Sequence, residues 1–122
     1  MQTTPKGDSI AFLSRDKEGH INIFAVSPNG GVIKQLSFHC FDIQTGFNFS
    51  PDGRYVAYGA ENAVHITAVA SGESHQVTEN FSDDEAPAGP VSWSPDGKTL
   101  AYNRYVGRDG QRFLQVFLLK ET

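Results

Sequence analysis

Cysteine is almost absent from this chain of 122 residues, which contains only Cys40. A single cysteine excludes an internal disulfide framework and a zinc site built from several cysteines, and it leaves the redox compartment open. We expect Cys40 to act as a small apolar side chain in the interior.

Long apolar runs and blocks of like charge are lacking as well. No apolar run approaches the roughly 18 residues that a membrane span needs, and the residues after Met1 do not have the pattern of a signal peptide. The net charge of −4 arises from scattered acidic residues, so the basic stripe of a nucleic-acid-binding protein is missing. We therefore expect neither membrane insertion nor a nucleic-acid partner.

Amphipathic helical periodicity is also missing, and a repeat takes its place. Two copies begin at Phe49 and Trp93, where an aromatic residue precedes Ser-Pro-Asp-Gly, two further residues, an apolar residue and Ala-Tyr. The prolines of these copies, Pro51 and Pro95, are 44 positions apart. A weaker copy lies 46 positions before Pro51 and keeps a proline at Pro5, followed by glycine, alanine and an aromatic residue.

This spacing is close to the roughly 40 to 45 residues of a four-stranded propeller blade. Ser-Pro-Asp-Gly predicts a tight turn, because proline presets φ, aspartate caps locally and glycine accepts positive φ. The sequence therefore predicts an all-β chain with about three four-stranded antiparallel blades of a β-propeller, a partial or open propeller whose first and last blades are incomplete. The expected blades, within one propeller segment of residues 1–122, are residues 3–37, 46–78 and 90–119.

The strands and links follow from this assignment. Third strands are expected at residues 21–26, 64–69 and 114–119, and outer strands at residues 32–36 and 75–78. The links between second and third strands vary in length and are expected at residues 14–19, 59–62 and 103–112. Because strands alternate in direction, these links share one face with the long connections between blades, and function is expected there.

At its Ser-Pro-Asp-Gly-x-x-Φ-Ala-Tyr repeats the chain resembles the TolB-like propellers, which are related in architecture to WD-repeat proteins. Residues 10–16, residues 35–37 and residues 49–53 are also similar to the C-terminal part of uncharacterised bacterial TolB-like proteins. The resemblance implies a propeller, commonly of six blades, that makes protein contacts or carries sites on its loops. It favours a bacterial periplasmic location, although the chain itself shows no signal peptide. The motif encodes a turn and a packing pattern rather than chemistry.

A metal-dependent alternative comes from relatives that share the repeat, the oligogalacturonate lyases, which the resemblance implies hold a divalent cation with histidines near the propeller axis. The four histidines here, His20, His39, His65 and His75, form no close pair such as H-x-x-x-H. Gly46-Phe47-Asn48 stands where those lyases are expected to carry a histidine. We therefore expect no metal site and no cofactor.

Nucleophilic catalysis is not indicated either. The segments around Ser9 and Ser74 lack the second glycine of a Gly-x-Ser-x-Gly elbow, and both lie where the repeat needs a turn or hairpin. The only acidic cluster, residues 83–85, suits a solvated loop, with weak binding of a cation or a basic partner as the alternative. No catalytic residue is expected.

Two groups of residues are candidates for binding. The link of residues 37–45 mixes bulky apolar side chains with His39, Asp42 and Gln44. One interpretation is a loop that plugs the gap between blades, and the other places these three polar residues at the mouth of the central channel. The second group, on the longest expected link, is Arg104, Tyr105 and Arg108.

The expected function is that of a non-catalytic module that binds a protein or peptide partner and that either self-associates or belongs to a longer propeller. The alternative is part of a carbohydrate-active propeller enzyme that resembles the oligogalacturonate lyases. Edges without a neighbouring strand at both ends would expose apolar surface and free backbone groups, and this favours assembly.

Overall fold

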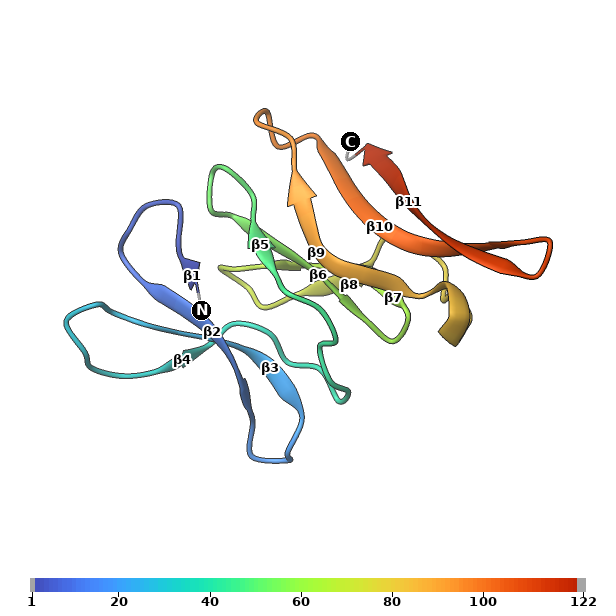
Figure 1. The fold of residues 1–122 in the computed structure, drawn as a ribbon. Coiled ribbons are helices and arrows are strands. Elements are labelled where there is room, and N and C mark those ends of the chain that lie inside the picture. Colours follow the sequence, from blue (N-terminus) through green and yellow to red (C-terminus); the bar gives the residue numbers. More distant parts are fainter. Residues whose placement is uncertain (1, 121–122) are drawn as a thin grey trace.

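Three antiparallel sheets follow one another along the chain, one for each copy of the repeat (Figure 1). The computed structural model describes residues 2–120. The predicted all-β propeller architecture is confirmed, and within the described residues the only helix is the short 3-10 helix η1 (Asp83–Glu85). That part of the chain contains no helix long and apolar enough to cross a membrane.

In each sheet the strands lie side by side in the order of the chain, from the inner strand outward. The first sheet contains β1 (Gln2–Thr3), β2 (Ile10–Arg15), β3 (Ile21–Val26) and β4 (Lys34–Gln35). The second contains β5 (Asn48–Phe49), β6 (Tyr55–Ala60), β7 (Ala63–Ala68) and β8 (Ser74–Gln76). The third contains β9 (Pro87–Trp93), β10 (Thr99–Arg108) and β11 (Gln111–Lys120).

The first and third blades differ in how many strands they contain. We expected the first blade to be incomplete, but Gln2 and Thr3 pair with β2, so this blade has all four strands with a very short inner one. The third blade has no outer strand among the described residues, as expected. The outer strand predicted at residues 32–36 is shorter, because only Lys34 and Gln35 pair with β3.

The Ser-Pro-Asp-Gly turn has the predicted local geometry. The carboxylate of Asp52 accepts hydrogen bonds from the Ser50 hydroxyl (2.7 Å) and the Arg54 amide (3.0 Å). Gly53 has a φ of +75°, which a side chain would disfavour. A Cβ on Gly53 would also lie 3.8 Å from Pro5, so the proline of one blade abuts the turn glycine of the next. The proline, aspartate and glycine of the repeat thus determine the turn, and the contact between proline and glycine brings neighbouring blades together.

The alanines of the repeat occupy equivalent positions, as predicted. Across to the inner strand, the pairs are Ala11 with Gln2, Ala57 with Asn48 and Ala101 with Ser92. Ala11 and Ala57 are fully buried, whereas Ala101 is only half-buried. The difference follows from position, because the third sheet has no neighbour on that face within the described chain.

The apolar core lies between the blades rather than within one of them. Tyr58, Val56 and Ala60 of the middle sheet pack on the first blade, and Ala57, Val64 and Ile66 pack on the third. Both faces of the middle sheet are therefore covered, and β6 and β7 are buried almost throughout.

The last hairpin corrects the sequence analysis. The longest link was expected at residues 103–112, but β10 and β11 pair without interruption from Thr99 and Lys120 to Arg108 and Gln111. The turn is Asp109-Gly110, with φ values of 52° and 76°, which is a two-residue Asp-Gly hairpin connection. Figure 1 shows this hairpin, in orange and red, extending beyond the rest of its sheet.

Candidate functional site

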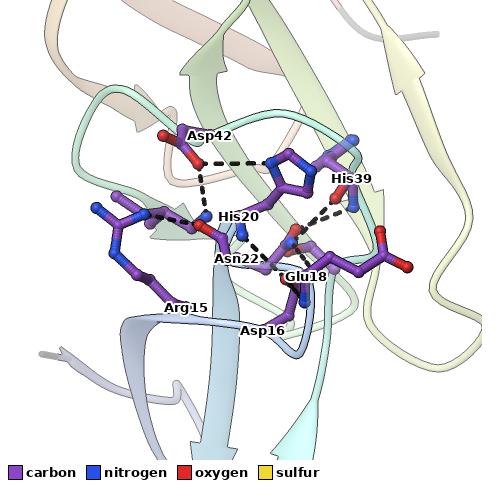
Figure 2. A network of polar contacts seen from close by, with 10 residues as sticks. Arg15, Asp16, Glu18, His20, Asn22, His39 and Asp42 are labelled. Carbon is purple, nitrogen blue, oxygen red and sulfur yellow. Dashed lines mark hydrogen bonds and ion pairs between the residues drawn. The ribbon is translucent and has the colours of Figure 1, made fainter.

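The start of the link of residues 37–45 is held by a buried asparagine of the first blade, Asn22 on β3. The Asn22 side-chain amide donates to the Asp16 carboxylate (3.1 Å) and to the His39 carbonyl (3.2 Å). Its oxygen accepts from the Ser37 hydroxyl (2.8 Å) and the His39 amide (3.0 Å). Figure 2 shows Asn22 in contact with both Asp16 and His39. All the hydrogen-bonding capacity of the Asn22 side chain is therefore used within the protein.

Asp16 holds the turn that leads into β3. Its carboxylate accepts from the backbone amides of His20 (2.9 Å) and Glu18 (3.0 Å). These hydrogen bonds, that of His20 above all, lower the pKa of the Asp16 carboxyl, against a smaller opposing effect of desolvation. Asp16 is therefore an ionised turn cap that is joined to the link through Asn22.

The His39 ring packs among aromatic side chains of the link and the middle blade. Its centroid lies 4.5 Å from that of Phe41, in a stacked arrangement, and 5.6 Å from those of Tyr58 and His65. Its Nε2 atom forms a hydrogen bond with the Tyr58 hydroxyl. Burial, with the charge of His65 as a second cause, lowers the pKa of His39 to about 4. The imidazole is thus neutral near pH 7.

A chain of hydroxyl groups continues from His39 through the middle blade. The Tyr58 hydroxyl lies 2.6 Å from Oγ1 of Thr67, and that atom lies 2.6 Å from Oγ of Ser74. Burial raises the pKa of the Tyr58 phenol and lowers that of His65, whose Nε2 is bonded to the Ala60 carbonyl at 2.9 Å. The cluster thus consists of neutral groups. Its hydrogen bonds run from His39 to Ser74, and the His65 ring packs beside them.

The other two predicted residues of this link lie at different places along it. The Asp42 carboxylate accepts the Ile21 amide (2.8 Å) and lies 3.9 Å from Nδ1 of His20 (Figure 2). The Gln44 side-chain oxygen accepts the Asn62 amide (3.3 Å). One of the two interpretations of the link places these three residues together at the channel mouth. In the structure His39 contacts β6 and β7, whereas Asp42 contacts the start of β3. Ile43 is buried, as the loop-plug interpretation expects, and Phe41 is partly buried.

A depression of about 310 Å³ borders His39. Its lining residues are Asp16, Lys17, Glu18, Gln35, Phe38, His39 and Cys40. Cys40 was expected in the interior but is exposed, because it lies on the link, outside the strands whose side chains form the core. A binding role for His39, Asp42 and Gln44 stays a prediction, and of the three only His39 borders this depression.

Arg104 lies on β10 rather than on a loop, and it is largely enclosed. Its guanidinium carbon lies 4.2 Å from the Phe81 ring centroid and 4.4 Å from that of Phe117. Nη1 lies 3.9 Å from the Glu85 carboxylate, and the side chain is only 17% exposed. The residue therefore joins the link before β9 to the last hairpin.

Tyr105 and Arg108 lie further along the same strand. The Tyr105 ring is covered by Arg112, whose guanidinium carbon is 4.4 Å from the ring centroid. Arg108 is exposed and lines a depression of about 390 Å³ beside η1, together with Asp84 and Glu85. Of the second predicted group, Arg108 is thus the most accessible to a ligand.

Several residues of these networks were not found from the sequence. Asn22 and Ser37 are the buried polar residues that hold the link of residues 37–45. In the other network, Phe81 and Glu85 enclose Arg104. The Asp109-Gly110 pair was a usable signal, because this dipeptide marks a hairpin and would have put Arg104 on a strand. Among residues 2–120 no group of three or more His, Cys, Asp or Glu is arranged to hold a metal ion.

No protein-family model matches the chain. Over 102 residues, which make up 84% of the chain, it is 35% identical to the uncharacterised protein YidR of Escherichia coli, strain K12. The chain spans 24% of that relative's length.

Solved propeller structures match nearly the whole chain. A putative TolB from Agrobacterium tumefaciens has a TM-score of 0.72 and 18% identity, over 96% of this chain and 43% of that one. TolB from Acinetobacter baumannii has a TM-score of 0.67 and 25% identity, over 93% and 27%. An oligogalacturonate lyase from Vibrio parahaemolyticus has a TM-score of 0.73 and 15% identity, over 98% and 35%.

Proposed function

We propose that this chain, which has the TolB-like β-propeller fold, is a non-catalytic module for protein–protein assembly, and that its partner surface is another propeller blade. One observation carries the proposal. Positions that are buried between blades in the first two sheets are exposed in the third, although the register makes them equivalent.

The equivalence is fixed by the strand pairing. Ala11, Ala57 and Ala101 pair with Ala25, Ile66 and Leu118, respectively. The next position on the same face of the third strand is Ile23, Val64 and Val116. The residues at these positions in the first two blades are at most 6% exposed. In the third blade Val116 is 63% exposed and Leu118 is 69% exposed. Together with Leu114 (57%), they form an open apolar face, such as marks an interaction surface.

The contacts between the repeat turns of neighbouring blades also indicate that the partner is a further blade. Pro5 abuts Gly53, and Pro51 lies 3.7 Å from a Cβ built on Gly97, so each proline meets the turn glycine of the following blade. By the same spacing Pro95 would meet the glycine of a further blade. At the other end, no atom of the described chain lies within 4 Å of a Cβ built on Gly7. The two ends are therefore complementary, as a head-to-tail assembly requires.

Sedimentation velocity at micromolar concentration tests the proposal. We expect the chain to associate, and we expect Leu114→Lys combined with Leu118→Lys to give a monomer of unchanged fold. Val32→Lys is the control, because Val32 is 92% exposed but lies before β4 on the first blade. A parent chain that stays monomeric with its apolar face open would contradict the proposal.

A second candidate is a carbohydrate-active propeller, which the likeness in fold to an oligogalacturonate lyase motivates. The test is incubation of the chain with oligogalacturonate and Mn²⁺, with product followed over time. We expect no turnover. Turnover that depends on His39, which borders the 310 Å³ depression, would instead favour the lyase-like function.

A further inference from the structure

The outer strands of the first two blades end in the same pattern, a glutamine followed by an apolar residue and a hydroxyl residue. In the first blade the pattern is residues 35–37, and in the second it is residues 76–78. In both cases the glutamine pairs with the same position of the third strand, since Gln35 pairs with Phe24 and Gln76 with His65. The pattern is thus placed identically on two blades.

In the first blade three hydrogen bonds fix this segment. The Leu36 amide donates to the Ile23 carbonyl (2.8 Å), and the Ile23 amide donates to the Ser37 hydroxyl (2.9 Å). The Gln35 side chain donates to the Ser37 carbonyl (2.8 Å). The hydroxyl residue therefore replaces a backbone carbonyl as the partner of the third strand, and Leu36 enters the core between the blades.

The second blade repeats all three bonds. The Val77 amide donates to the Val64 carbonyl (2.9 Å), and the Val64 amide donates to the Thr78 hydroxyl (3.0 Å). The Gln76 side chain donates to the Thr78 carbonyl (2.7 Å). Residues on the third strand differ between the blades, yet the bonds are the same. The pattern therefore supplies the hydrogen-bond partners for the outer edge of the third strand of a blade.

In the third blade this edge is unpaired among the residues that the structure describes. The register places Val116 where the others have Ile23 and Val64, and no strand pairs with the outer edge of β11 within the described chain. By the equivalence, the Val116 amide and carbonyl point outward, and so do those of Leu118 two residues further on. A ten-residue edge with exposed apolar side chains readily pairs with another strand.

We infer that the outer edge of β11 binds an extended segment of a partner polypeptide with the pattern Gln–apolar–Ser/Thr. The segment runs antiparallel to β11, with its glutamine opposite Phe117 and its apolar residue over Val116 and Leu118. The backbone bonds supply affinity, and the pattern fixes the register, because a slip of one residue would turn the apolar side chain away from the sheet. This inference rests on the proposed function, since it names the segment that the assembly module takes.

A suitable probe is a fluorescent peptide with the sequence of residues 72–80. In the second blade, Ala68 donates to the Glu73 carbonyl, and the register makes Lys120 the equivalent of Ala68. Glu73 of the bound peptide would then lie opposite Lys120, which adds charge complementarity. We expect saturable binding by anisotropy, weakened about tenfold by Thr78→Val in the peptide, because the hydrogen bond between the Thr78 hydroxyl and the Val116 amide is lost.

Two variants of the chain test the edge itself. Val116→Pro removes the outward amide but no bond to β10, which suits proline at a strand edge, and we expect at least about tenfold weaker binding. Val116→Thr keeps the amide and should bind within about twofold of the parent. If Val116→Pro fails to fold, hydrogen exchange on the parent decides the question. The peptide should then slow exchange at Val116 and Leu118 and leave Val64 unchanged.

The outcomes separate this inference from the proposed function. Absence of saturable binding, equal binding by Val116→Pro, or protection on β7 instead of β11 would each overturn the inference. Self-association that neither the peptide nor Val116→Pro affects would also overturn it but would leave the assembly function intact. A chain that binds neither itself nor the peptide would contradict both.

Discussion

The imidazole of His39 and the hydroxyl of Tyr58 are hydrogen-bonded across the boundary between the link and the middle blade. This contact continues through Thr67 to Ser74. The link thus reaches the interior of the second blade by a side chain that must be neutral to fit there. The same contact makes the stability of the folded chain dependent on pH.

We expect the free energy of unfolding to fall as the pH is lowered from about 6.5 toward 4. The pKa of His39 is about 4 in the folded chain, below its ordinary value of 6.5, and that of His65 is also lowered. In this window the unfolded chain therefore binds more protons than the folded chain, and stability is fully present only above it. Urea unfolding at fixed protein concentration, from pH 7.5 to 5, measures the effect.

The histidine variants make this assignment specific. His39→Gln should flatten the profile between pH 7 and 5, whereas His75→Gln, at an exposed strand position, should keep the fall in stability, because the buried His39 is still in place. A profile equally steep in His39→Gln and the parent would show that other groups cause the loss. The window stays above the range in which Asp16 and Asp52 protonate, since hydrogen bonds lower the pKa of both carboxyls.

The sequence predicted what is locally encoded. The turn at Gly53 depends on residues within five positions, so it could be inferred with its proline and its neighbouring strands. Asn22 could not be assigned, because its partners Ser37 and His39 are 15 and 17 positions away and nothing local marks them. The strand position of Arg104 is encoded locally by the Asp109-Gly110 turn, but its enclosure could not be inferred, because it depends on Phe81 and Phe117 from other segments.

Asn22→Ala should destabilise the chain by about 2 to 3 kcal/mol, because it leaves the Ser37 hydroxyl and the His39 amide without their buried acceptor. Asn29→Ala is the matched control, since Asn29 is exposed in the hairpin between β3 and β4, and it should change stability by less than about 0.5 kcal/mol. Urea denaturation gives both values. Equal effects would mean that the Asn22 network contributes nothing to stability.

Arg104→Ala should cost about 2 kcal/mol, because the guanidinium lies between Phe81 and Phe117 and its aliphatic stem is buried with it. Arg108→Ala, on the same strand but exposed, should stay within about 0.5 kcal/mol of the parent. Chemical denaturation at one protein concentration compares the two. If Arg104→Ala were as stable as Arg108→Ala, the enclosed arginine would be free to serve a ligand, as the sequence suggested.

Gly59→Ala should be destabilising by about 1 to 3 kcal/mol, for a reason that a second substitution can test. A Cβ on Gly59 would lie 2.6 Å from Cγ2 of Thr45, whose hydroxyl also accepts the Gly59 amide at 2.7 Å. Gly46→Ala is the control, because its Cβ would lie 3.4 Å from Pro90.

Thr45→Ser removes the methyl group and keeps the hydroxyl, so it should recover part of the stability lost in Gly59→Ala. The expected interaction energy in the double-mutant cycle is at least about 0.5 kcal/mol in the stabilising direction. Thermal and urea unfolding of the four chains measure it. Strict additivity would show that Gly59 is not held by contact with Thr45, and the seating of the link on the middle blade would then need another explanation.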